Sequence, residues 1–117
     1  MTSFTIYHNP SCSNSRGTLA LLQEHEVEPK VIEYLKTPPS AAELKAIIGK
    51  LGITAEQLVR KKEDVYKANY AGKTLTDAQW IEAMVSHPIL IERPIVVSGD
   101  RAVLGRPPES VKPLLEQ

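Results

Sequence analysis

The beginning of the chain has the pattern of a β-strand, a helix and a second β-strand, and this order limits the folds that the chain can adopt. The three segments are Phe4–Tyr7, Ser13 to about Glu26, and Val31–Tyr34. Leu19 and Leu22 stand three residues apart in the second segment, which is helical spacing. A connection of this length joins parallel strands through a right-handed crossover. The sequence therefore predicts a βαβ unit.

The middle of the chain, from about residue 38 to 87, contains three helix signals. Three sequences of the type Ser/Thr-x-x-Glu/Gln each precede apolar residues at helical spacing, and they begin at Ser40, Thr54 and Thr76. In such capping boxes the two side chains satisfy each other's backbone N–H groups at a helix start. Pro88 ends the last of these helices. We therefore expect a helical insertion here.

After the insertion the chain returns to β structure. Ile89–Ile91 and Ile95–Val97 are apolar strand candidates, and Ser98–Arg101 is a hairpin turn into Ala102–Leu104. A last helix is expected from Pro107 on, shortened or kinked by a proline beyond its first turn.

This order of elements is that of a thioredoxin-like α/β fold. We expect one domain over residues 1–117, with a small mixed sheet, flanking helices and the insertion at about 38–87. In that fold the active cysteine stands at the start of the first helix, where Cys12 stands here.

The composition excludes several classes of protein. Lys+Arg and Asp+Glu both number 14, so the net charge of zero argues against a nucleic-acid partner. The sequence shows no secretory leader and no apolar run of membrane-spanning length. One cysteine cannot form an internal disulfide, which fits a reducing cytoplasm, and three scattered histidines offer no metal-ligand spacing. We expect a cytoplasmic monomer without bound metal or cofactor.

Cys12 lies between the first strand and the first helix, in the run His8–Arg16. Unpaired N–H groups and the positive end of the helix dipole stabilise a thiolate at such a position. They lower a cysteine pKa from about 8.5 to between about 3.5 and 7.5. His8 and Arg16 could add positive charge. The alternative, a merely buried cysteine, does not suit its polar neighbours. The pattern predicts a nucleophile directed at an anionic or reducible target.

Three arginines, Arg60, Arg93 and Arg106, lie near helix ends or turns. Each alone is most simply a solvated surface residue. Together with a thiolate they indicate an anion cradle, because the guanidinium fork suits oxyanions. A cysteine-based phosphatase would need arginine at the position of Thr18, and a dithiol redox motif would need cysteine at the position of Ser15.

Several runs of the sequence occur together in a recognisable order. They are Ile6–Cys12 with Ser15–Arg16, Tyr34–Leu35 with Pro38–Pro39, Leu58–Lys61, His87–Val97 and Gly105–Pro107. In these runs the chain resembles, over essentially its whole length, the ArsC-like arsenate reductase family, which uses glutathione and glutaredoxin. It is most similar to the short members, which lack a C-terminal extension.

The resemblance implies a role for each matching residue. Cys12 would attack arsenate, and His8 and Ser15 would help to hold its thiolate. The oxyanion and the arsenic intermediate would be bound by Arg60, Arg93 and Arg106. Glutathione, a co-substrate, would attack the adduct, and glutaredoxin would complete the two-electron reduction to arsenite. The lack of a second cysteine agrees, because the electrons must then come from an external thiol. A cis peptide bond is expected before Pro94, beside the cysteine.

Two other interpretations stay open. Spx-like members of the same family are redox-responsive transcriptional regulators that bind RNA polymerase. They usually carry a second cysteine at the position of Ser15, so this serine and the intact set of arginines argue against that role. A monothiol glutaredoxin-like protein would have no need of the arginines.

Overall fold

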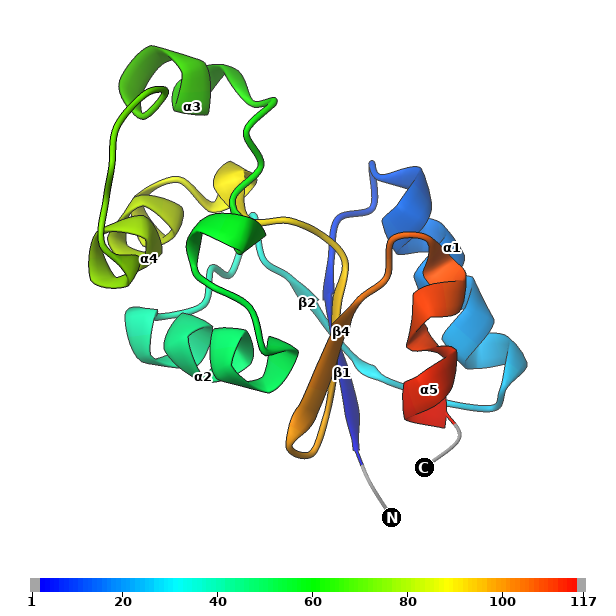
Figure 1. The fold of residues 1–117 in the computed structure, drawn as a ribbon. Coiled ribbons are helices and arrows are strands. Elements are labelled where there is room, and N and C mark those ends of the chain that lie inside the picture. The colour runs from blue at the N-terminus through cyan, green and yellow to red at the C-terminus, as the bar shows by residue number, and fades with distance from the viewer. Residues whose placement is uncertain (1–2, 116–117) are drawn as a thin grey trace. The chain divides into compact units, whose positions relative to one another are not determined.

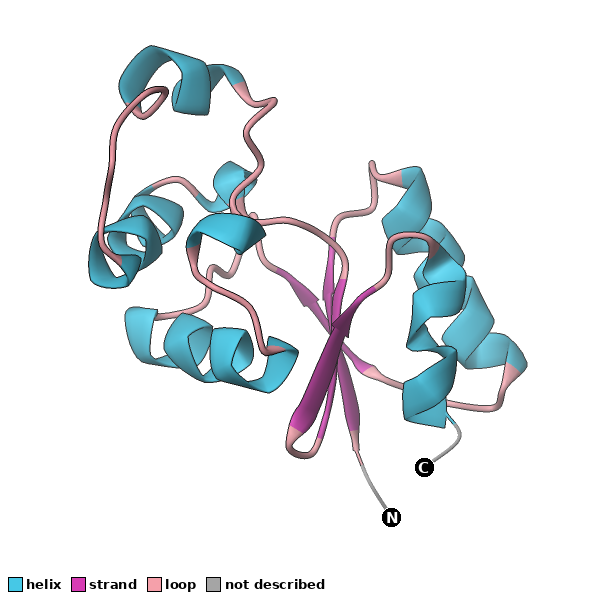
Figure 2. Cartoon of the chain, viewed as in Figure 1, coloured by secondary structure: helices cyan, strands magenta, loops and turns pink. Residues whose placement is uncertain are grey.

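The structure is a computed structural model that describes residues 3–115, and the chain forms two compact units. One comprises the described residues up to Thr37 and those from Arg93 on, and the other is Pro38–Glu92. The first contains the β-sheet, whereas the regular elements of the second are helices (Figures 1 and 2). Among residues 3–115 no helix is both long and apolar enough to cross a membrane.

The sheet of the first unit has four strands in the order β2–β1–β3–β4. They are β1 (Phe4–His8), β2 (Lys30–Glu33), β3 (Ile95–Ser98) and β4 (Arg101–Leu104). β1 and β2 are parallel and are connected through α1 (Ser13–Glu24), as the βαβ pattern predicts. β3 runs antiparallel to β1, and β4 antiparallel to β3 (Figure 1). The hairpin turn is as predicted, with Gly99 at φ +61°, a backbone region that favours glycine. The result is the mixed sheet that the sequence predicts.

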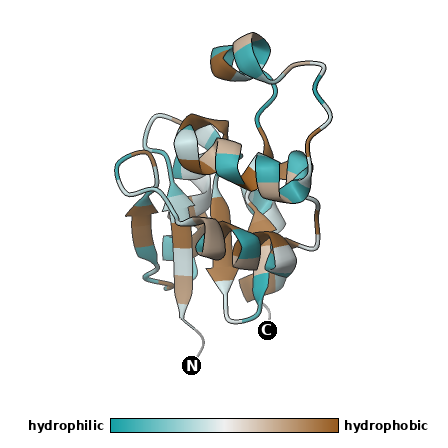
Figure 3. Cartoon of the chain, turned by 90° about the vertical axis from the view of Figure 1, so that its left-hand side faces the viewer, coloured by the Kyte–Doolittle hydropathy of each residue, from teal (hydrophilic) through white to brown (hydrophobic). Residues whose placement is uncertain are grey.

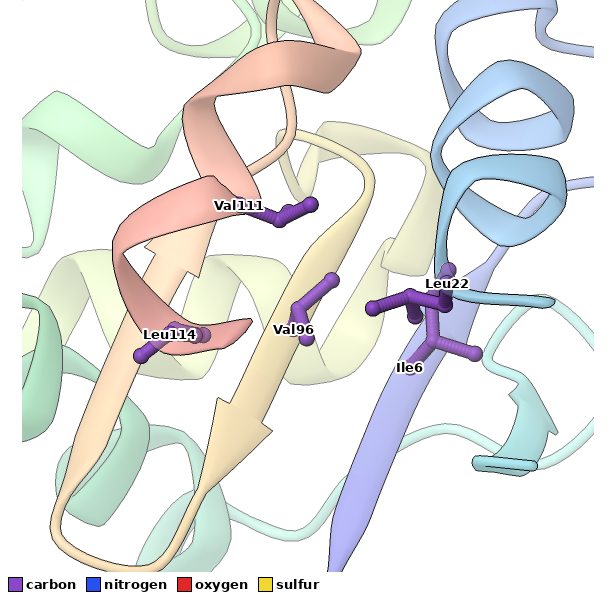
Figure 4. Close-up of a cluster of buried hydrophobic side chains, with 5 residues drawn as sticks. All are labelled: Ile6, Leu22, Val96, Val111 and Leu114. Carbon is purple, nitrogen blue, oxygen red and sulfur yellow. The ribbon is translucent and has the colours of Figure 1, made fainter. Parts of the chain in front are cut away.

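One face of this sheet holds the core that fixes α1. Ile6 and Val96 are direct cross-strand neighbours, so their side chains share that face. The chain's last elements, η3 (Pro108–Val111) and α5 (Lys112–Leu115), pack there beside α1. Five side chains from strands and helices meet in one buried cluster, Ile6, Leu22, Val96, Val111 and Leu114 (Figure 4). This packing sets where the N-terminus of α1 lies.

The second unit follows the predicted helix signals closely. Its elements are α2 (Ala41–Leu51), η1 (Glu56–Leu58), α3 (Asp64–Asn69), α4 (Asp77–Ser86) and η2 (Pro88–Leu90). Reciprocal capping-box hydrogen bonds form at Ser40 and Thr76, and the Thr54 box opens the 3₁₀ turn η1. α3 buries none of its residues and is largely hydrophilic (top of Figure 3). The tyrosine rings of Tyr66 and Tyr70 lie against Trp80 of α4.

The prediction of a strand at Ile89–Ile91 is wrong. Pro88 instead starts the 3₁₀ turn η2, which the Leu90 N–H closes by donating to the His87 carbonyl at 2.9 Å. Proline favours the first turn of a helix because its φ is fixed and its missing N–H is not needed there. Ile91 alone pairs, in a single antiparallel bridge with Val59. Burial rather than membership of the sheet therefore explains Leu90 and Ile91, whereas Ile89 is exposed.

The final helix is short, as the proline beyond its first turn predicts. It is divided into the 3₁₀ helix η3 and the single α-helical turn α5, with Pro113 as the second residue of α5. A proline is tolerated there because the first N–H groups of a helix have no intrahelical partner.

We expect Leu22→Ala to lower the free energy of unfolding by about 2–5 kcal/mol, because it leaves a cavity where α1 packs on the sheet. Leu22 is fully buried (0% exposed), whereas Leu35 is 44% exposed and Leu35→Ala should change stability by less than about 0.5 kcal/mol. Urea unfolding of both variants measures the difference. Equal losses in the two would contradict the role of this cluster.

Candidate active site

Cys12 is held in a tight turn between β1 and α1. The Asn9 side-chain oxygen accepts a hydrogen bond from the Ser11 N–H (2.9 Å), and the Asn9 carbonyl accepts one from the Cys12 N–H (3.0 Å). Cys12 is the N-cap residue, with extended backbone angles, and its carbonyl accepts the helical N–H of Arg16 at 3.0 Å. The thiol therefore lies at the predicted place, the N-terminus of α1.

His8 and Ser15 form a buried hydrogen-bonded pair next to this turn. The Ser15 Oγ lies 2.6 Å from the His8 Nδ1 and accepts the Asn9 N–H at 2.9 Å. Burial lowers the pKa of His8. The carboxylate of Glu33 raises this pKa and the positive charge of Arg16 lowers it, and the net pKa lies below the ordinary value. A neutral imidazole can accept the Ser15 hydroxyl proton at Nδ1. His8 is thus uncharged near pH 7, and the prediction that it adds positive charge to the thiol is wrong.

The surroundings of Cys12 favour its thiolate. Burial by itself would raise the pKa of Cys12, but several other contacts lower it more. They are the backbone N–H of Ser15, a side-chain hydrogen bond from Arg93, the backbone N–H of Asn14 and the positive charge of Arg93. The pKa of the Cys12 thiol consequently lies below its ordinary value, as its position at a helix start predicts.

Arg16 does not act as the nearby cation that the sequence suggests. Its Nη1 donates to the Pro10 carbonyl at 2.8 Å and so closes the turn that carries the cysteine. The cation beside the thiol is Arg93, which is remote in sequence. Proximity along the chain pointed to the wrong arginine.

Arg93 and Arg106 stand just before β3 and just after β4. The Arg93–Pro94 peptide bond is cis, as predicted, and the Arg106–Pro107 bond is cis as well. The Arg106 Nη1 donates to the Arg93 carbonyl at 3.3 Å, and the Gly105 N–H donates to the Pro94 carbonyl at 2.9 Å. These hydrogen bonds join the segment before β3 to the segment after β4. The Arg93 side chain donates a hydrogen bond to the Cys12 sulfur.

Sequence reasoning missed the close approach of Gly105 to α1. A Cβ at Gly105 would lie 2.8 Å from the Pro94 Cγ and would also collide with the Thr18 side chain. The Thr18 Oγ1 donates to the Asn14 carbonyl (2.8 Å) and lies 3.2 Å from the Gly105 carbonyl. Only glycine allows the loop before Arg106 to come this near the helix. Nothing in the local sequence signals a contact between positions so far apart.

Arg60 lies in the second unit and is held by two carboxylates. Its Nε donates to Glu63 at 3.1 Å and its Nη1 to Glu92 at 2.7 Å, and its side chain is 15% exposed. Burial would lower the pKa of Arg60, but the two carboxylates raise it above the ordinary value. The other predicted site residues all belong to the first unit, namely His8, Cys12, Ser15, Arg93, Pro94 and Arg106.

Residues 3–115 contain no group of three or more His, Cys, Asp or Glu side chains placed to hold a metal ion.

A sequence model of the ArsC family matches residues 7–114. The chain belongs to the ArsC family. This membership accounts for the run of motifs from Ile6 to Pro107 and for the thioredoxin-like fold.

This ArsC family member is similar to several known proteins over nearly its whole length. It is 53% identical to the uncharacterized protein YfgD of Escherichia coli (strain K12), and the match covers 91% of each chain. It is 46% identical to the arsenate reductase of Haemophilus influenzae, covering 97% of this chain and 99% of that protein. The solved arsenate reductase of Vibrio cholerae has a TM-score of 0.92 and 48% identity, covering 96% of this chain and 97% of that one.

We expect Arg93→Ala to raise the pKa of Cys12, because the thiolate loses a charged hydrogen-bond donor. The rate of iodoacetamide alkylation as a function of pH reports this pKa. In the folded wild type the rate should reach half its maximum at a lower pH than in urea, and Arg93→Ala should move that midpoint upward. Arg101→Ala, which removes an exposed arginine of β4, should leave the midpoint unchanged. An unmoved midpoint in Arg93→Ala would contradict the contact.

We expect Gly105→Ala to destabilise the protein by about 1–3 kcal/mol, because the added methyl group collides with Pro94 and Thr18. Adding Thr18→Ala should recover part of the loss. Gly49→Ala is the matched control: a Cβ there meets nothing within 4 Å, and alanine is the better helix former, so this change should be neutral or stabilising. Thermal unfolding of the variants tests the expectation, which a harmless Gly105→Ala would refute.

Proposed function

We propose that the protein is an arsenate reductase that works through a Cys12 thiolate and takes its electrons from glutathione and glutaredoxin. The observation that carries this proposal is the sole cysteine of the chain, placed at the start of α1 with Arg93 on its sulfur and its pKa lowered. The arsenate reductases among its relatives support the same activity. Neither an Spx-like regulator nor a monothiol glutaredoxin is favoured by these relatives.

In the first step the Cys12 thiolate attacks the arsenic atom of arsenate or a related oxyanion. A sulfur–arsenic bond forms, an arsenic–oxygen bond breaks, and the oxygen leaves as water after taking up protons. The Arg93 guanidinium, which already contacts the sulfur, would bind the oxyanion and offset its charge during the attack. Arg106 and Arg60 are the other two guanidinium groups that we assign to the oxyanion.

His8 and Ser15 would serve this step by holding the start of α1 rather than by adding charge. The Ser15 hydroxyl bonds both the Asn9 N–H and the neutral His8 ring, and the Ser15 N–H is among the groups that lower the pKa of Cys12. The pair thereby keeps a main-chain donor directed at the sulfur.

The reduction needs two electrons, and the chain has no second thiol to supply them. Glutathione would therefore attack the Cys12–arsenic adduct, and glutaredoxin would complete the exchange. Arsenic passes from the +5 to the +3 state and leaves as arsenite, two external thiols end as one disulfide, and the Cys12 thiolate is restored. A cytoplasm rich in glutathione is the setting that this chemistry requires.

We expect the purified protein to reduce arsenate when glutathione, glutaredoxin, glutathione reductase and NADPH are supplied, with NADPH oxidation as the readout. Cys12→Ser should abolish the activity, since serine is a far weaker nucleophile at neutral pH. Omitting glutathione or glutaredoxin should abolish it as well. Activity that survives in Cys12→Ser, or a wild type that does not consume NADPH with arsenate, would defeat the proposal.

A further inference from the structure

Glu92 forms an ion pair with one of the arginines that we assign to the oxyanion and precedes another in the sequence. Its carboxylate binds the Arg60 Nη1 at 2.7 Å, and the next residue in the chain is Arg93, whose side chain binds the Cys12 sulfur. The side chains of Arg60 and Glu92 are only 15% and 23% exposed, so water screens this ion pair less than a surface pair.

The backbone holds the two partners in register. The Arg60 N–H donates to the Leu90 carbonyl at 2.7 Å, and the Glu92 N–H donates to the Leu58 carbonyl at 2.8 Å. Leu58 and Leu90 are fully buried, which anchors both chain segments. In such an antiparallel pairing Arg60 and Glu92 are diagonal neighbours, and long side chains reach each other at that spacing. The ion pair therefore rests on a fixed backbone.

The two carboxylates fix the orientation of the Arg60 guanidinium. Glu63 accepts from Nε and Glu92 from Nη1, so bonds on two different nitrogens of one planar group set both its plane and its direction. A guanidinium has five N–H donors, and these two bonds do not exhaust its capacity to bind an oxyanion.

We propose that Glu92 is a positioning residue, which holds Arg60 in the orientation that binds the oxyanion. This inference rests on the proposed function for the role of Arg60. A negative charge beside Arg60 also weakens its attraction for an anion, so the two effects of Glu92 oppose each other. The positioning effect is the larger of the two. An arginine without fixed partners would lose side-chain entropy on binding the oxyanion, whereas an arginine already fixed by ion pairs has lost that entropy before binding.

The test compares Glu92→Ala, Glu92→Gln, Arg60→Ala and the double variant Glu92→Ala/Arg60→Ala. Calorimetric binding of arsenate to these proteins in a Cys12→Ser background gives the Kd without chemistry, and the coupled assay with Cys12 present gives KM and kcat. The matched control is Glu56→Ala, which removes another ion pair of the same unit, between Glu56 and Lys61 at 2.7 Å. Thermal unfolding checks that each variant is folded.

Glu92→Ala should raise the Kd and KM for arsenate about tenfold, a loss within the range that misplaced positioning groups cause. Glu92→Gln keeps an oxygen acceptor for Arg60 and should recover part of the affinity, and it also serves if Glu92→Ala fails to fold. Glu56→Ala should bind arsenate as the wild type does. In the Arg60→Ala background the change at Glu92 should have no further effect, because the two residues act as a unit.

Three results would overturn the inference. They are equal or tighter binding by Glu92→Ala, a Glu92 effect that persists without Arg60, and an Arg60→Ala variant that binds arsenate normally. The coupled assay separates these failures from failure of the proposed function. A wild type that binds arsenate in the expected pattern across the variants but does not reduce it would leave the positioning role intact and remove the reductase activity.

Discussion

The packing of α1 on the sheet determines the chemistry that Cys12 can perform. Leu22 on the helix is buried against Ile6 of β1 and Val96 of β3, so the helix axis is fixed relative to the strands. Cys12 then follows β1 after a short turn and lies where the first N–H groups of α1 are unpaired. Arg93, at the entrance to β3, reaches the thiol because β3 is the immediate neighbour of β1. The hydrophobic core therefore determines where Cys12, the proposed nucleophile, lies.

Desolvation and hydrogen bonds have opposite effects on the pKa of Cys12, and the hydrogen bonds together with the charge of Arg93 prevail. Burial disfavours the thiolate of Cys12, and it also disfavours a charged His8. The neutral imidazole of His8 is therefore favoured, and the positive charge acting on Cys12 comes from Arg93, since arginine stays protonated even when buried. The site combines a neutral histidine, which holds Ser15 and through it the Asn9 N–H, with a permanently charged arginine, which stabilises the Cys12 thiolate.

The sequence predicts the features that depend on neighbouring residues. The capping boxes at Ser40 and Thr76 lead into helices, and Cys12 lies at a helix start, because each signal acts within one turn of the chain. The cis bond before Pro94 is expected from the family resemblance rather than from a local signal, and it is confirmed. The strand expected at Ile89–Ile91 fails because burial explains an apolar run as well as β pairing does.

The features that sequence reasoning missed depend on contacts between distant positions. Gly105 lies close to Thr18 of α1, and Glu92 forms an ion pair with Arg60. In both cases the two residues are far apart in the sequence and come together only in the folded chain. Proximity in the sequence suggests His8 and Arg16 as sources of positive charge near Cys12, whereas the Arg16 side chain donates to the Pro10 carbonyl within the turn. α3 has no apolar stripe and buries no residue, so its sequence gives no periodic signal.

The hydroxyl of Ser15 is engaged on two sides at once, and this limits how the protein can change its redox chemistry. A cysteine at this position would create the two-cysteine spacing of a dithiol switch, but a sulfur is both a weak donor and a weak acceptor. It would leave the Asn9 N–H and the His8 ring poorly satisfied inside the protein, with the free-energy penalty of buried polar groups that lack good partners. A change from a one-thiol to a two-thiol protein would therefore destabilise the turn that carries Cys12, the proposed nucleophile. The hydrogen bonds that shape the site thus support the external reductant of the proposed function.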